Sequence, residues 1–303
     1  MATTSTLSQR SQGRTEVSII RWCSRLIALW HLTSLDAPTV AVTWTLAFGW
    51  VADIRLPLWV STVLALAAWT VYIADRLLDA RSSTSPLRQR HLFHWKHRRI
   101  FAPLAVAATT IAGVLILHSM PEAARARNSV LAAAALVYFA SVHGPWRLPR
   151  PANSLRVRWG MPFRIPKELL VGVLFTLACA TPTWTRVPGH RLELVAPILC
   201  FIALAWLNCH AIESWESQNS SPRPRELSLF HLAVSLAGIT LLAAAAALML
   251  HLFRASAMLV AASVSSALLA CLDRTQHRLT PIALRALADL VLLTPLMLLA
   301  GWR

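Results

Sequence analysis

Apolar segments of about 20 residues alternate with short polar loops along most of the 303-residue chain. A helix of that length crosses a hydrocarbon layer of about 30 Å, so the pattern is typical of a polytopic membrane protein. We therefore predict an all-α fold, a bundle of about nine transmembrane helices, with spans near residues 37–52, 56–74, 100–118, 128–143, 168–185, 192–212, 228–251, 255–272 and 283–301.

The first residues of the chain follow a different pattern. Residues 1–20 are mostly polar and lack the apolar core of a cleaved signal peptide. The next stretch, "WCSRLIALWHL", has the composition of an amphipathic helix at a membrane surface. Asp36 and Pro38 interrupt the start of the first span. We expect residues 1–36 to form a polar tail with an interfacial helix, and residues 37–303 to form a single transmembrane domain.

Basic residues are distributed unevenly between the two sides of this predicted bundle. Most of the 29 Lys and Arg residues fall in the N-terminal tail and in the loops after the second, fourth, sixth and eighth spans. Because cytoplasmic loops carry an excess of Lys and Arg, we expect a cytoplasmic N-terminus and a C-terminus on the opposite side. The expected location is a bacterial inner membrane.

The composition agrees with a membrane location and narrows the partners. Hydrophobic residues make up 56% of the chain, charged residues 14%, and the mean hydropathy is +0.54. A net charge of +16 would suggest nucleic acid for a soluble protein. Here the basic residues sit in short loops, so we expect membrane lipids or an anionic substrate as partners, and no nucleic acid. The five cysteines lie in or beside apolar runs without a CxxC motif, which is typical of small core residues.

Two aspartates stand where the second span ends, in "VYIADRLLDARSS". Asp75 and Asp79 are four residues apart, so they share one face of a helix and repel each other. A divalent cation between them would remove the repulsion, and Mg²⁺ binds one or two carboxylates together with waters and substrate phosphates. The alternative is that the aspartates pair with basic neighbours such as Arg76 or Arg81.

A second group of oxygen-bearing side chains follows the sixth span, in "WLNCHAIESWESQ". Asn208, Glu213 and Glu216 could point into one cavity, and the predicted topology puts them on the same side of the membrane as Asp75. Two such groups at one face are what a metal-bridged diphosphate site needs. A solvated acidic loop is the alternative. Arg76, Arg81 and Lys167 could hold phosphate oxygens, although the positive-inside bias alone also accounts for them.

These features together resemble the UbiA superfamily of intramembrane aromatic prenyltransferases, over roughly residues 37–301. The family's first motif reads N-D-x-x-D-x-x-x-D, and "VYIADRLLD" keeps its last two aspartates as Asp75 and Asp79. The second motif is commonly D-x-x-x-D, and here the equivalent stretch offers Asn208, Glu213 and Glu216 without an aspartate. Fewer carboxylates lower the negative charge available for two Mg²⁺ ions.

The resemblance implies a helical bundle in which Mg²⁺ holds a polyprenyl diphosphate at the cytoplasmic mouth of a cavity, and a prenyl group passes to a lipophilic, possibly aromatic acceptor. Carried onto this chain, it implies Mg²⁺ ligands at Asp75, Asp79, Asn208, Glu213 and Glu216. The catalytic residues would be Asp75, Asp79 and Glu213, and the substrate would contact Arg76, Arg81, Lys167 and Asn208. A prenyl diphosphate cyclase, a transporter and a noncatalytic lipid-binding protein are alternative functions.

Other polar residues have simpler explanations. His91, His94 and His97 recur every third residue and could share zinc or haem, or lie on an interfacial helix beside Trp95. Asp289 falls inside the last predicted span, where an unpaired carboxylate costs about 2.5–3.5 kcal/mol. Arg285, one turn earlier, is the simplest partner for Asp289, and a position facing a cavity is the alternative.

Overall fold

The computed structural model of the chain describes residue 22 and residues 24–82, 89–143, 166–218 and 228–301. These parts of the chain are helical and contain no strand, which confirms the predicted all-α class. A helical segment over residues 24–32 is followed by α2 (Asp36–Val51), α3 (Leu58–Ser82), α4 (Gln89–Lys96), α5 (Arg98–Ser119), α6 (Glu122–His143), α7 (Lys167–Trp184), α8 (Arg191–Gln218), α9 (Leu229–Met249), α10 (Phe253–Thr275), α11 (Pro281–Leu290) and α12 (Leu296–Leu299).

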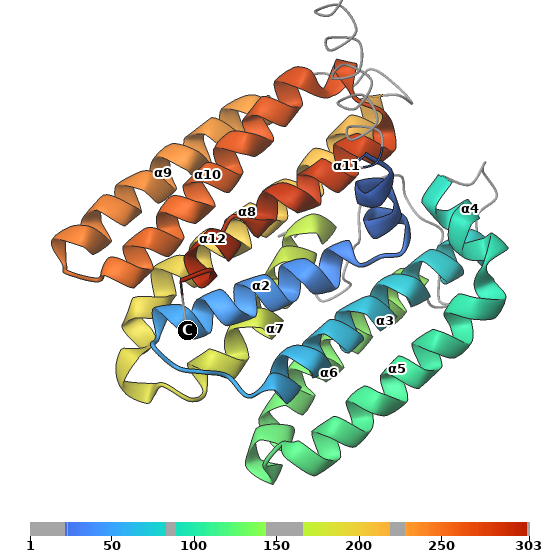
Figure 1. The fold of residues 1–303 in the computed structure, drawn as a ribbon, viewed down its shortest axis with the longest axis horizontal. Helices are drawn as coiled ribbons and strands as arrows, with labels where there is room; N and C mark the ends of the chain where they lie inside the picture. The colour runs from blue at the N-terminus through green and yellow to red at the C-terminus, as the bar shows by residue number, and fades with distance from the viewer. Residues whose placement is uncertain (1–21, 23, 83–88, 144–165, 219–227, 302–303) are drawn as a thin grey trace, which may run out of the picture.

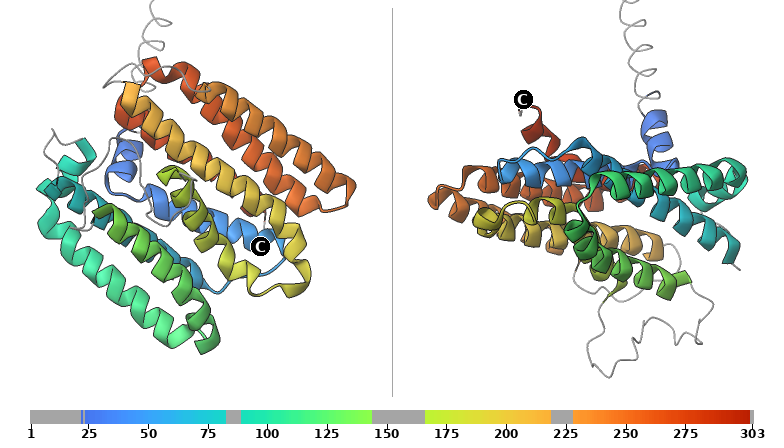
Figure 2. Two further views of the ribbon diagram at one scale, coloured as in Figure 1. Left: turned by 180° about the vertical axis from the view of Figure 1, so that it is seen from behind. Right: turned by 90° about the horizontal axis from the view of Figure 1, so that it is seen from below.

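The long helices lie lengthwise beside one another and reverse direction at each turn (Figure 1). Seen from below, α2 and α5 lie above α6 and α7 (Figure 2). Five of them, α3, α5, α8, α9 and α10, are long and apolar enough to cross a membrane. These helices support an integral membrane protein, and nine crossings stay a prediction. The polar tail of residues 1–20 lies outside the described residues.

Helix α2 is the centre of the bundle and is far more buried than its neighbours. Its Trp44 stacks on Phe201 of α8 with ring centroids 3.7 Å apart and an angle of 8° between the ring planes. By contrast, most residues of α6 are exposed. Since α2 contacts α3, α7, α8 and α11, it connects the elements that carry the candidate site.

Asp36 and Pro38 begin α2 and do not interrupt it. The Asp36 Oδ1 atom accepts the backbone N–H of Ala37 at 2.9 Å. A carboxylate in the first turn interacts favourably with the helix dipole, and a proline there removes an N–H that has no partner within the helix. The two residues that weaken the first span as a sequence pattern therefore fix where the helix starts.

The last helical region is broken between α11 and α12, and side chains compensate the break. The Trp44 Nε1–H donates to the carbonyl of Leu292 at 2.8 Å, and the Ser265 hydroxyl donates to the carbonyl of Val291 at 2.7 Å. The Thr294 hydroxyl donates to the carbonyl of Ala261 at 2.8 Å. The carbonyls of Val291 and Leu292 at the break are therefore paired with side chains of α10 and α2, and Thr294 ties the region to α10.

Candidate functional site at one end of the bundle

The polar residues singled out from the sequence gather at one end of the bundle. The alternating helix directions put the starts of α2, α7 and α11 at the same end as the last turns of α3, α6 and α8 (Figure 1). The predicted convergence of the two acidic groups at one face therefore agrees with the helix order. At this end the side chains form two groups that differ in depth.

The first group, which we call the surface cluster, consists of Asp75, Asp79, His143, Lys167, Glu168 and Glu213. The His143 Nε2 atom lies 2.9 Å from Asp75 Oδ1, and its Nδ1 atom lies 3.7 Å from Asp79 Oδ1. Both aspartates are exposed by 40% or more of their side-chain area, whereas His143 is almost covered. The shared partner of the aspartate pair is thus a histidine at the end of α6, and neither Arg76 nor Arg81 plays that part.

The other half of the surface cluster comes from α7 and α8. The Lys167 Nζ atom lies 2.7 Å from Glu213 Oε2 and 3.6 Å from Glu168 Oε1. The acidic groups that follow the second and sixth predicted spans are therefore each paired with a basic side chain from another helix at this end of the bundle.

Two further predicted residues lie around this cluster. Glu216 on α8 forms an ion pair with Arg285 of α11. Arg81 is exposed in the last turn of α3. Arg285 therefore bridges to α8, and it is not the partner of Asp289 that its spacing suggested.

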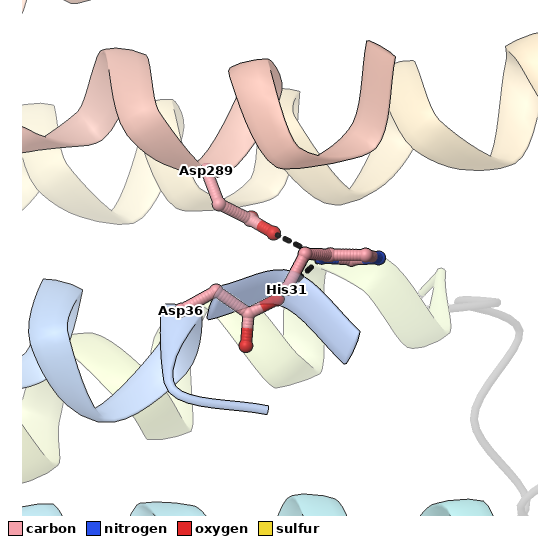
Figure 3. Close-up of side chains that lie close together, drawn as sticks. All are labelled: His31, Asp36 and Asp289. Carbon is pink, nitrogen blue, oxygen red and sulfur yellow. Dashed lines mark hydrogen bonds and ion pairs between the residues drawn. The ribbon is translucent and has the colours of Figure 1, made fainter. Parts of the chain in front are cut away.

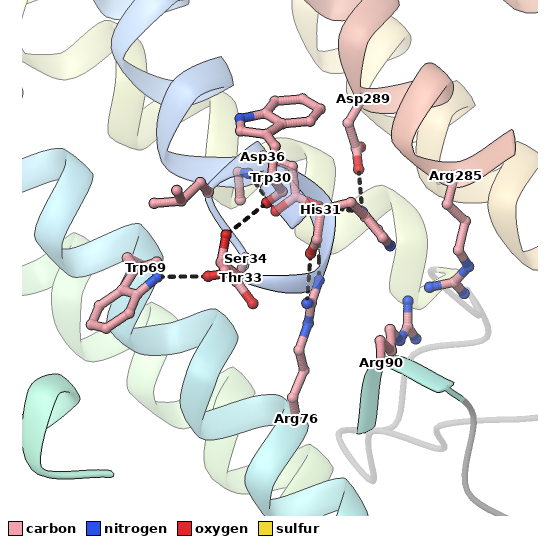
Figure 4. Close-up of polar contacts among 12 residues, drawn as sticks. Trp30, His31, Thr33, Ser34, Asp36, Trp69, Arg76, Arg90, Arg285 and Asp289 are labelled. Atoms are coloured by element: carbon pink, nitrogen blue, oxygen red, sulfur yellow. Dashed lines mark hydrogen bonds and ion pairs between the residues drawn. The ribbon is translucent and has the colours of Figure 1, made fainter. Parts of the chain in front are cut away.

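The second group, the buried cluster, consists of His31, Asp36, Arg76, Asn208 and Asp289. The His31 Nδ1 atom lies 2.6 Å from Asp36 Oδ2 and 3.7 Å from Asp289 Oδ2 (Figure 3). Arg76 extends from α3 toward the turn before α2, where its Nη1 donates to the carbonyl of His31 at 3.1 Å (Figure 4). Its Nη2 lies 3.8 Å from Asp36 Oδ2. Arg76, a predicted phosphate ligand, is thus only 3% exposed, and its guanidinium contacts His31 and Asp36 inside the bundle.

Local backbone geometry brings His31 and Asp36 together. Ser34 adopts a left-handed conformation with φ of 60° in the turn between the helical segment 24–32 and α2. The Ser34 hydroxyl is buried and lies 3.2 Å from His94 Nε2. The Trp69 Nε1–H donates to the carbonyl of Thr33 at 3.0 Å, so α3 and α4 both hold this turn in place.

Asn208 and Asp289 join the buried cluster to a small cavity. The Asn208 Nδ2 donates to Asp289 Oδ1 at 3.0 Å. The cavity has a volume of about 40 Å³, and its walls come from α2, α3, α7, α8 and the α11 region, through Ala37, Val40, Tyr72, Val171, Gly172, Phe175, Ala205, Asn208, Cys209, Asp289 and Leu292. Gly172 lets α7 approach α8 closely, because a Cβ atom there would lie 2.9 Å from the backbone nitrogen of Trp206. The cavity-facing position considered for Asp289 is confirmed.

Two histidines at this end have opposite electrostatic surroundings. Burial disfavours the charged imidazole of His31, but its interactions with Asp289 and Asp36 outweigh burial and raise its pKa. Burial lowers the pKa of His94 to about 4. The Nδ1 of His94 faces the carbonyl of Arg90 at 2.9 Å, so the neutral ring carries its proton there and accepts from Ser34 at Nε2. His94 is a buried structural residue of α4.

The five predicted Mg²⁺ ligands do not form one coordination sphere. Asp75 and Asp79 are half exposed and side by side, which suits an ion bound mainly through waters and phosphates. Asn208 belongs to the buried cluster, and Glu213 and Glu216 each pair with a basic residue. Of the five predicted ligands, only Asp75 and Asp79 are therefore placed to bind Mg²⁺ in this structure.

The buried cluster is the group that the sequence did not predict as a unit. From the sequence, we expected His31 to lie in an interfacial helix and Asp36 to interrupt the first span. We expected Asp289 to pair with Arg285. The available signal was the presence of Asp36 and Asp289 at the edge of, or inside, predicted spans, where carboxylates need partners.

Comparison with known proteins does not assign the chain: no protein-family model, curated protein or solved structure matches it.

Proposed function

We propose that the chain is a membrane-embedded enzyme that transfers a prenyl group from a polyprenyl diphosphate to a lipophilic acceptor, as the UbiA-like sequence pattern suggests. The single observation that carries this proposal is that Asp75 of α3, paired with His143, and Glu213 of α8, paired with Lys167, lie at the same end of the bundle. Enzymes that release a diphosphate at a membrane surface need cation-binding and phosphate-binding groups in one place, and the surface cluster offers both.

Each residue of the surface cluster has a specific part in this proposal. Asp75 and Asp79 would hold Mg²⁺, which supplies Lewis-acid stabilisation of the leaving diphosphate. Lys167, half exposed, would exchange its pairing with Glu213 for a phosphate oxygen. The bond between the allylic carbon and the diphosphate oxygen breaks, and the diphosphate leaves with the electron pair. The acceptor then forms the new carbon bond and loses a proton.

One observation favours a noncatalytic lipid-binding protein as a second candidate. His143 already contacts Asp75, and Lys167 already pairs with Glu213. A cluster that is balanced by its own ion pairs can stabilise the end of the bundle without any substrate.

Product analysis separates the two candidates. Membranes containing the full chain are incubated with Mg²⁺, a lipid extract and prenyl diphosphates of several lengths, and products are identified by mass spectrometry. We expect a prenylated product that disappears in a variant with both Asp75→Asn and Asp79→Asn. Absence of any product across chain lengths and acceptors would favour the noncatalytic candidate.

Asp53→Asn is the matched control. Asp53 lies at the opposite end of the bundle, where it pairs with Arg254 at 2.5 Å. Its φ of 54° is a conformation that asparagine adopts readily, so the substitution preserves the backbone. Equal loss of product in the control and in the Asp75/Asp79 variant would contradict the assigned site.

A further inference from the structure

The two carboxylates of the buried cluster are oriented in the same way. The Oδ1 atom of Asp36 accepts the backbone N–H of Ala37 at 2.9 Å, and the Oδ1 atom of Asp289 accepts Asn208 Nδ2 at 3.0 Å. These bonds leave the Oδ2 atom of each aspartate directed at His31 Nδ1 (Figure 3). Carboxylates with one oxygen held by a donor and the other presented to a common point are typical of metal ligands.

The ligand atoms of this group are close enough to share an ion. One nitrogen of His31 and one oxygen each of Asp36 and Asp289 all lie within 4.8 Å of one another. Within the described ranges, no other group of three histidine, cysteine or acidic side chains meets this condition. An imidazole combined with carboxylates suits a transition-metal dication such as Zn²⁺ better than Mg²⁺, which prefers oxygen ligands alone.

Asn208 is an independent sign that something binds here. It is 5% exposed, and within the described parts of the chain its Oδ1 atom has no hydrogen-bond partner. Leaving a buried acceptor unpaired costs about 1–3 kcal/mol. The same side chain lines the cavity beside Asp289, and a volume of about 40 Å³ admits only water-sized occupants. An ion, directly or through one water, would satisfy this oxygen.

The charges around the site also favour a cation. The charged groups that face it are the carboxylates of Asp36 and Asp289 and the guanidinium of Arg76, which leave one net negative charge when His31 is neutral. Buried charges are expensive unless they are compensated. A bound dication would compensate this negative charge.

We propose that His31, Asp36 and Asp289 bind one Zn²⁺-type dication, with Asn208 completing its coordination directly or through a water. The ion would tie the segment before α2 and the start of α2 to α11, elements that lie at opposite ends of the sequence. This site goes beyond the proposed prenyl transfer and does not depend on it, because Asp75, Asp79, Lys167 and Glu213 take no part.

Metal retention by the full chain in lipid nanodiscs tests the site. The protein is stripped with a chelator, loaded with Zn²⁺, desalted and analysed for metal content, and its thermal unfolding is followed with and without Zn²⁺. We expect one retained equivalent per chain and a higher unfolding temperature. We expect Asp289→Asn to lose both effects, and Asn208→Leu to weaken retention about 10–100-fold, as loss of a supporting group usually does.

Asp75→Asn is the matched control, since it removes a carboxylate from the surface cluster at the same end of the bundle. We expect it to retain Zn²⁺ as the wild type does. If Asp289→Asn does not fold, Co²⁺ in the wild-type protein gives the second readout, a visible absorption spectrum of a low-coordinate nitrogen and oxygen site. No retained equivalent, full retention by Asp289→Asn, equal loss in Asp75→Asn, or a Co²⁺ spectrum of the hydrated ion would each overturn the proposal.

Discussion

The surface cluster and the buried cluster lie at the same end of the bundle and contain similar residue types, yet their surroundings differ. In the surface cluster, Asp75 and Asp79 are exposed by 40% or more, and Lys167 and Glu213 by about half. In the buried cluster, the side chains of His31 and Asp36 are at most 3% exposed. Ion pairs near water contribute little to stability, whereas breaking a buried pair leaves an uncompensated charge.

The difference teaches where chemistry with an outside molecule can take place. Exposed groups can exchange an internal partner for a substrate phosphate at small cost, which is what the proposed transferase needs. Buried groups hold fixed positions and can accept only a small occupant, such as a proton, a water or a metal ion. Four experiments test this division between the two clusters.

The largest expected effect is the loss of stability when an aspartate of the buried cluster is neutralised, compared with the same change in the surface cluster. We expect Asp36→Asn to destabilise the protein by about 3–5 kcal/mol, because it leaves the charges of His31 and Arg76 without their partner. Asp75→Asn should cost about 0–1 kcal/mol. Unfolding of both variants in detergent, followed by circular dichroism against denaturant concentration, gives the two values. Similar losses for the two variants would remove the distinction between the clusters.

A buried bond next to the buried cluster should have the next largest effect. Trp44→Phe keeps the ring that stacks on Phe201 but leaves the carbonyl of Leu292 without its indole donor. We expect a loss of about 1–3 kcal/mol. Trp22, 63% exposed, provides the control, and Trp22→Phe should leave the unfolding midpoint unchanged. An unchanged midpoint for Trp44→Phe would mean that the broken last helix does not need this bond.

Acid should destabilise the turn that holds the buried cluster. The pKa of His94 is lowered to about 4, so below the ordinary histidine pKa of about 6.5 the unfolded chain binds a proton that the folded chain does not. Stability contributed by neutral His94 is therefore complete above that pH and is lost as the pH falls toward 4. We expect His94→Gln to flatten this part of the pH dependence of the unfolding midpoint. An equally steep acid loss in His94→Gln would assign the dependence to other groups.

The smallest effect belongs to the surface cluster. A double-mutant cycle of Lys167→Met and Glu213→Gln should give a coupling free energy of about 0.2–1 kcal/mol that declines with added salt. The cycle is measured by unfolding at low and high ionic strength. A coupling of several kcal/mol, insensitive to salt, would show that this pair is structural and is not available to exchange for a phosphate.

Helix positions could be predicted from the sequence because hydrophobic runs report directly on burial and on membrane contact. Each predicted span coincides with a helical region, and five helices have the length and composition to cross a membrane. The common face of Asp75 and Asp79 also follows from helical spacing.

The partners of these residues could not be predicted in the same way. Arg285 and Asp289 are four residues apart, which suggested a pair within one helix. In the structure each contacts a different helix or segment, Glu216 for Arg285 and His31 with Asn208 for Asp289. Such contacts depend on how helices pack, and spacing along one helix carries no information about them. His31 shows the same limit, because its position depends on the left-handed turn at Ser34.

Binding of a non-hydrolysable prenyl diphosphate analogue to the protein in nanodiscs tests the division of roles most directly. Affinities are measured for the wild type, Lys167→Met and Asp289→Asn in the presence of Mg²⁺. The proposed roles predict at least tenfold weaker binding for Lys167→Met, about 1.4 kcal/mol, and unchanged binding for Asp289→Asn. Weakened binding in Asp289→Asn with wild-type affinity in Lys167→Met would contradict the assignment of the substrate to the surface cluster.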